Sequence, residues 1–178
     1  MHPSLLLLIA TMALAQAQTP QTPGTLKFTT PEGWQPRAAS STMRVAEFVL
    51  PARDGAPGNA ELVVYYFGGS GGSVDANIQR WLGQMQQPDG RATADVATRD
   101  TRTINGLKVS LLDVSGTYVA EVRPGATEKH NSPGFRMRTA VVETARGPYY
   151  VKLVGPAQTV ASWNPSVEQF LGSLTFAQ

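Results

Sequence analysis

Asn105-Gly106 separates two runs of strand-forming residues, at about 93–102 and 107–119. Both central residues of a type I′ turn have positive φ, which Asn and Gly tolerate best, so this pair predicts a tight hairpin. Turn-rich breaks also separate strands expected at 43–50 and 60–67, and at 135–144 and 149–154. Strands joined by hairpins run antiparallel, so the chain predicts a mainly antiparallel sheet and no strand–helix–strand repeat.

Two segments have helical spacing of their apolar residues. The first runs from Ser73, a suitable N-cap, to about Gln86. The second covers about 160–172, where Asn164-Pro165 predicts a new helix start and Gly172 an end. With short strands at 26–29 and 174–176 the order becomes β-β-β-α-β-β-β-β-α-β. This is an α+β fold, an α/β/α sandwich with helices packed on a mainly antiparallel β-sheet.

The N-terminal segment predicts export. Leu5 to Leu14 is apolar but too short to span a bilayer, and small-x-small triplets end at Ala15 and Ala17. A buried N-terminal helix would need a polar face, which residues 4–15 lack. We therefore expect a signal peptide at 1–17, cleaved after Ala15 or Ala17, an extended linker at 18–24 and a single domain at 25–178.

The composition excludes several kinds of chemistry. The chain has no cysteine, so it has no thiol nucleophile, thiolate metal site or cysteine-linked lipid anchor. We expect a soluble periplasmic or extracellular protein with no membrane anchor. The net charge is +2, and no two Lys or Arg residues are adjacent. Arg136 and Arg138 are the only basic pair on one strand face; they are candidates for partner binding or simply solvated arginines, and nucleic-acid binding is not expected.

A glycine-rich loop at 68–73 leads directly into the first helix. Free backbone amides at a helix N-terminus can bind an anion, so Gly71, Gly72 and Ser73, with Asn77 and Arg80 on the helix, form a candidate ligand site. The alternative is that the glycines only allow a tight turn from strand to helix. The loop matches neither a Walker A motif nor the dinucleotide-binding pattern.

His130 is the one histidine after the signal peptide, in a long polar loop at 120–134. It has no companions spaced for a metal site, so we expect no metal and no cofactor, and take it as a possible contact for a partner. A hydrolase would need two carboxylates in one deep pocket, and five candidates exist: Glu47, Glu61, Asp75, Asp113 and Glu143. No catalytic motif is present, so we expect no enzyme activity.

The order of elements, the Pro31-Glu32-Gly33-Trp34 segment and the closing sequence FLGSLTF resemble the PsbP-like fold. Residues 67–69, 77–81, 133–137 and 152–156 look more specifically like an uncharacterised group of secreted bacterial proteins. The resemblance implies a binding or assembly module and no catalytic residue. Our leading hypothesis is a module that binds an envelope or extracellular protein through loop 120–134 or the exposed sheet face; a small-anion receptor using Gly68 to Arg80 is the alternative.

Overall fold

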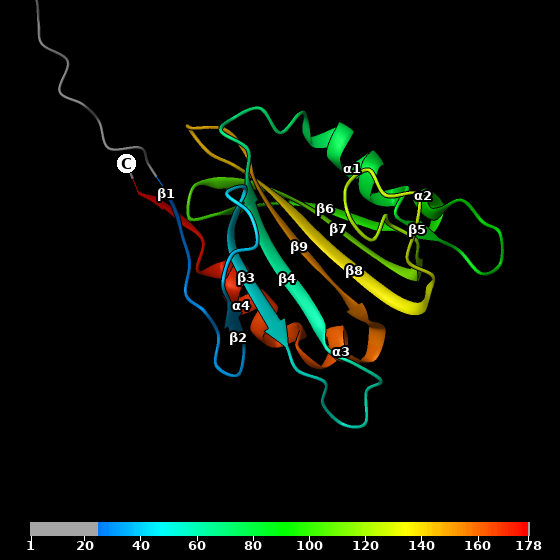
Figure 1. Ribbon diagram of the computed structural model, residues 1–178. Helices are drawn as coiled ribbons and strands as arrows, with labels where there is room; N and C mark the ends of the chain where they lie inside the picture. Colours follow the sequence, from blue (N-terminus) through cyan, green and yellow to red (C-terminus); the bar gives the residue numbers. More distant parts are fainter. Residues whose placement is uncertain (1–24, 178) are drawn as a thin grey trace, which may run out of the picture.

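A computed structural model describes residues 25–177; the predicted signal peptide, the linker and Gln178 lie outside this range. The main sheet has the order β2-β3-β4-β9-β8-β7, and β5 and β6 both pair with the free edge of β7 (Figure 1). All of its pairs are antiparallel, which confirms the predicted α+β class. Its strands are β2 (Gln35–Arg37), β3 (Arg44–Leu50), β4 (Ala60–Tyr66), β5 (Met85–Gln86), β6 (Thr98–Ile104), β7 (Leu107–Tyr118), β8 (Ser132–Glu143) and β9 (Tyr149–Pro156). A separate two-stranded sheet joins β1 (Thr25–Lys27) to β10 (Thr175–Ala177).

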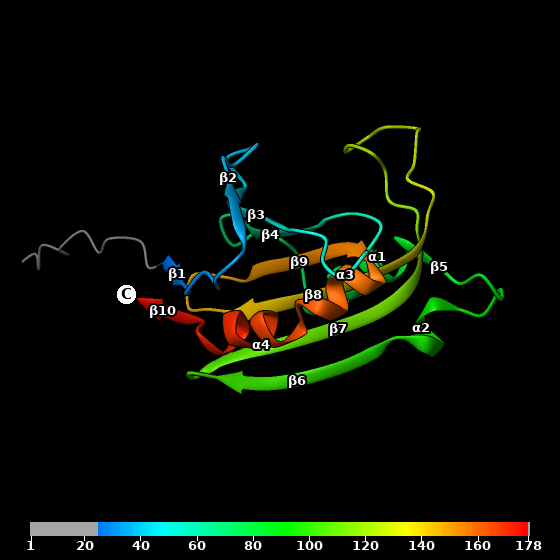
Figure 2. The ribbon, with the colours of Figure 1, turned by 90° about the horizontal axis from the view of Figure 1, so that it is seen from below.

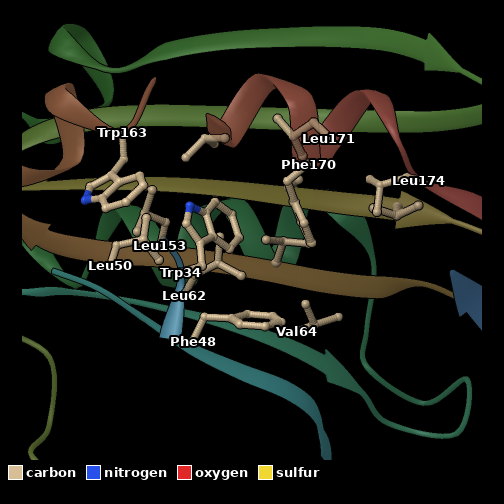
Figure 3. Close-up of a cluster of buried hydrophobic side chains, with 14 of the residues drawn as sticks. Trp34, Phe48, Leu50, Leu62, Val64, Leu153, Trp163, Phe170, Leu171 and Leu174 are labelled. Atoms are coloured by element: carbon tan, nitrogen blue, oxygen red, sulfur yellow. The ribbon is translucent and has the colours of Figure 1, made fainter. Parts of the chain in front are cut away.

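Helices cover both faces of the sheet, as expected from strands that lack a cleanly polar face. The helices are α1 (Val74–Leu82), α2 (Thr93–Val96), α3 (Ala157–Ser162) and α4 (Asn164–Gly172). On one face, α3 and α4 bury a core with β3, β4 and β9 that includes Trp34, Trp163 and Phe170 (Figures 2 and 3). On the other face, α1 packs Ile78 and Trp81 against β7, β8 and β9. The core under α3 and α4 extends across the strands from β3 to β7, whereas the core under α1 is centred on β7, β8 and β9.

Several predicted boundaries are wrong. Helix α1 ends at Leu82 and not near Gln86, because Gly83 is followed by β5, which pairs with the end of β7. Residues 93–96 form helix α2 where a strand was expected, and the Thr93 hydroxyl donates to the Met85 carbonyl at 2.9 Å. The C-terminal helix is divided into α3 and α4 at Asn164-Pro165, as predicted, but the N-cap of α4 is Trp163 and not Asn164. Strand β2 was not expected. Within residues 25–177 no helix is long and apolar enough to cross a membrane.

Candidate functional site

A polar cleft of about 610 Å³ lies on the α1 side of the sheet, where α1 leaves the strands uncovered. Its floor comes from β4 and β9, one wall from the C-terminal end of α1, and the other from the loop after β7. Figure 2 shows this loop and the β2–β3 hairpin projecting from the same side of the molecule. The residues that line it include Arg44, Glu61, Tyr65, Arg80, Gln84, Tyr118, Glu121, Val122, Arg123, Lys129, His130 and Lys152.

Lys152 stands on the floor of the cleft. Its ammonium group donates to the side-chain oxygen of Gln84 at 2.6 Å and to the Tyr118 hydroxyl at 2.9 Å, and it lies 5.0 Å from the centre of the Tyr118 ring. None of the ion pairs among residues 25–177 includes it. Burial, helped by the nearby positive charge of Arg80, lowers the pKa of Lys152 to about 8. The cleft therefore holds a desolvated cation whose hydrogen-bond partners are neutral.

Other charges in the cleft give it a positive balance. Arg44 pairs with Glu47 at 3.0 Å and lies 3.9 Å from Glu61, so its charge is partly compensated. The exposed Arg80 bonds the Asn77 side chain. Five Lys or Arg residues line the cleft against two carboxylates, those of Glu61 and Glu121. An anion is thus the complementary ligand.

Aromatic side chains line the cleft near Lys152. Burial raises the pKa of Tyr118 to about 12 and also raises that of Tyr65, so both remain neutral hydroxyls at physiological pH. The Tyr118 ring lies 5.1 Å from the His130 ring, centre to centre, at 33°. His130 thus lines the cleft beside Tyr118. Its backbone amide donates to the Ala120 carbonyl at 2.8 Å.

The loop wall is more regular than the sequence indicated. Strand β8 begins at Ser132, so the loop between β7 and β8 covers 119–131 and not 120–134. An antiparallel bridge pairs Glu121 with Lys129, and a Glu121 carboxylate oxygen accepts from the Gly125 amide at 2.8 Å. These bonds hold the charged side chains of the loop at the rim of the cleft.

The glycine-rich loop lies outside the cleft lining. Ser73 caps α1 by accepting from the Ala76 amide at 3.2 Å, as predicted. Asn77 is buried and donates to the carbonyl oxygens of Gly71 and Ser73 at 2.8 and 2.9 Å. A Cβ on Gly71 would lie 2.3 Å from the Tyr150 hydroxyl, which itself donates to the Gly72 carbonyl at 3.1 Å. These contacts give the loop a structural role. Of the five predicted ligand residues, only Arg80 lines the cleft, and the loop as an anion site stays a prediction.

Arg136 and Arg138 point to the opposite face of the sheet from His130. Arg136 binds both carboxylate oxygens of Asp113, at 2.8 and 2.6 Å. Arg138 bonds Glu168 on α4 and lies 3.4 Å from Asp113. The structure therefore does not bring the three predicted partner-binding residues together.

Most of the predicted carboxylates lie apart, but Glu47 and Glu61 share Arg44, at 3.0 and 3.9 Å. Of the five, Glu61 alone lines the cleft, Asp113 lies on the other face, and Glu143 pairs with Lys108 at 3.0 Å. Glu47 is buried, and although burial acts to raise its pKa, the hydrogen bonds from Ser40 and the charge of Arg44 lower it overall. Among residues 25–177 no three His, Asp or Glu side chains gather as a metal site would require.

Sequence reasoning missed Lys152, Tyr118 and Gln84 as site residues. One signal was available: Lys152 is the only charged residue in the strand sequence YYVKLVG, and a charge in a strand that is otherwise apolar needs a special environment. The sequence could not predict that Gln84 contributes to the cleft, because the first helix was expected to continue to about Gln86.

Comparison with known proteins finds similarity at the level of structure. No protein-family description matches the chain, and no curated protein matches it. Pseudomonas aeruginosa PA94, of unknown function, is 20% identical with a TM-score of 0.46, over 72% of this chain and 80% of that one. LpqN, involved in cell envelope biogenesis of Mycobacterium tuberculosis, is 12% identical with a TM-score of 0.48, over 88% of this chain and 85% of that one. At these identities the likeness is one of fold alone, and the PsbP-like resemblance stays a prediction.

Proposed function

We propose that this chain is an exported, non-enzymatic binding module that holds an acidic group of an envelope or extracellular protein in the polar cleft. Export follows from the predicted signal peptide at 1–17. The PsbP-like resemblance supports a binding role, since it implies a binding or assembly module. The cleft replaces the glycine-rich loop and the Arg136–Arg138 face as the main binding surface.

The observation that carries this proposal is the environment of Lys152. A buried ammonium group is costly unless a counter-ion accompanies it, and this one has only a glutamine and a tyrosine as hydrogen-bond partners. A carboxylate entering the cleft would supply the missing charge and form a charge-assisted bond. Arg80, Glu61 and Arg44 all lie near enough to affect the pKa of Lys152: Glu61 raises it without forming an ion pair with Lys152, and the two arginines, which lower it, would add to the attraction for an anion.

The rim of the cleft favours a protein as the source of the acidic group. Three large apolar side chains are exposed among the described residues: Met43 at 50%, Val45 at 46% and Val122 at 40%. Val122 lines the loop wall of the cleft, whereas Met43 and Val45 are neighbours of Arg44 in the chain and are not part of the cleft lining. Protein interfaces combine apolar contacts with polar and charged groups, so an exposed apolar side chain beside the charged cleft suits a protein partner. A small inorganic anion would leave these side chains unused.

The first test measures binding of labelled peptides in which glutamate alternates with leucine, by fluorescence anisotropy. We expect the wild type to bind them and Lys152→Met to lose tenfold or more in affinity. Lys27→Met is the matched control, because Lys27 is an exposed lysine in β1 away from the cleft. The proposal is refuted if glutamine-for-glutamate peptides bind equally well, or if Lys152→Met leaves the affinity unchanged.

A second test separates a protein partner from a small anion. A photo-reactive residue replacing Val122 should crosslink to a protein in the producing cell, and the adduct should disappear when Lys152→Met is added. The same group at Gln158, exposed on α3, should give no such adduct. If no adduct forms while inorganic phosphate raises the melting temperature in a Lys152-dependent manner, the small-anion alternative replaces a protein partner.

A further inference from the structure

A second cavity, of about 260 Å³, lies on the opposite face of the sheet, between α4 and the strands. Leu62, Leu153 and Ala140 line it from the sheet, and Val167 and Phe170 line it from α4; all five are buried. Figure 3 shows Phe170 coming from α4 while Leu62 and Leu153 come from the strands it covers. The inner end of the cavity therefore lies in the main hydrophobic core, and its outer end opens among polar and charged residues of β6, β7 and β8.

Such a hollow is unusual for a folded core. Protein interiors pack as densely as organic crystals, and apolar cavities of this scale stay dry and take up apolar molecules. At roughly 30 Å³ for each water-sized or methylene-sized group, the volume holds about nine of them. An unbranched apolar chain of about eight or nine carbons would fill this volume.

The mouth of the cavity lies between β6 and α4 and is lined by charges of both signs. Arg102 on β6 binds Asp100 and Glu168, both at 2.7 Å, and Glu168 also binds Arg138. Arg138 also forms an ion pair with Asp113 at 3.4 Å. The Arg102–Glu168 pair is exposed on both sides, at 43% and 44%, and exposed pairs of this kind are weak. It can therefore open to admit a ligand.

We propose that this cavity binds a neutral amphiphile with an unbranched apolar chain of about eight or nine carbons, which enters between β6 and α4. The apolar side chains of the core contact the alkyl chain of the ligand. The guanidinium groups of Arg102 and Arg138 at the mouth are already paired with carboxylates, so a hydroxyl or another neutral hydrogen-bonding head fits beside them better than an anion. This site is independent of the polar cleft on the other face.

The test titrates the folded protein with a series of 1-alkanols, butanol to dodecanol, by calorimetry and thermal melting. Each added methylene should raise the affinity about fourfold until the chain reaches eight or nine carbons, after which the affinity should stop rising. Octanoate should bind at least tenfold more weakly than octanol. The proposal is overturned if no alcohol binds, or if the affinity keeps rising through dodecanol. If octanoate binds as tightly as octanol, the preference for a neutral head group is overturned.

Cavity-filling variants give an independent readout. Ala140→Leu and Val167→Phe should each reduce octanol affinity at least tenfold, while their melting temperatures without ligand stay equal to or above that of the wild type. A merely adventitious effect of octanol would stabilise the filled variants as much as the wild type, and this result would overturn the proposal. If both variants fail to fold, the cutoff in chain length measured on the wild type still decides the matter.

Discussion

Replacing Lys152 by methionine should change how the stability of the protein depends on pH. Methionine keeps an unbranched stem of similar length but cannot ionise. In the folded protein the pKa of Lys152 is about 8, because burial penalises the charged form, whereas an unfolded lysine titrates near 10.4. Between these two values the unfolded chain binds a proton at this site and the folded chain does not.

The sign and size of the effect follow from proton linkage. Stability rises with pH wherever the unfolded state binds more protons, so the wild type should gain stability as the pH rises from 7 through 8 and onward. The two pKa values give a contribution of about 2 kcal/mol between pH 7 and 9.5. Lys152→Met removes this contribution and should leave a correspondingly flatter profile.

Urea unfolding at several pH values from 7 to 9.5 measures the effect. The series stops at 9.5 because burial raises the pKa of Tyr118 to about 12, so ionisation of unfolded tyrosine lowers stability from about pH 10 upward. Lys27→Met, at an exposed lysine, should keep the wild-type slope. Equal slopes for the wild type and Lys152→Met would refute the desolvated lysine and, with it, the main argument for an anionic ligand.

Three further variants test the parts of the structure that hold the two sites. Asn77→Ala should destabilise the protein by about 1–3 kcal/mol in urea unfolding, because two loop carbonyls lose a buried donor. Phe170→Ala should cost roughly 3–5 kcal/mol, or less if the adjoining cavity lets the core collapse, as measured by the midpoint of unfolding. Glu168→Gln should cost less than about 1 kcal/mol, since the side chains of Glu168 and Arg102 are exposed at 44% and 43%, and Arg138, exposed at 14%, still lies near Asp113; a calorimetric melt would detect a larger loss.

The turn sequences predicted the sheet well, because a hairpin is specified by residues that are neighbours in the chain. Asn105 and Gly106 both have positive φ, and the strands on either side pair in register from Ile104–Leu107 to Thr98–Asp113. Two-residue strands give no such signal: β5 exists because β7 is long enough to pair with both β6 and β5 along one edge. That pairing depends on tertiary contacts and cannot be read from residues 85–86 alone.

The candidate site was harder to predict, since its residues come from five separate segments of the chain. Arg80 and His130 were both identified, but as members of two different surfaces. The structure brings them into one cleft and moves Arg136 and Arg138 to the other face, where Asp113 and Glu168 pair with them. Alternation along β8 fixes which face each arginine takes, but only the packing of α1 and α4 determines which face carries the cleft.

The early end of α1 connects the fold to the function we propose. Because the helix ends at Leu82, the chain turns into β5, and the Gln84 carbonyl accepts from the Val119 amide at 2.9 Å. This places the Gln84 side chain on the Lys152 ammonium and keeps the following turn of the chain off the floor of the cleft. A helix that continued to residue 86 would carry Gln84 away from β7. The early end of the helix thus leaves the cleft open and places a neutral partner on Lys152, which forms no ion pair among residues 25–177.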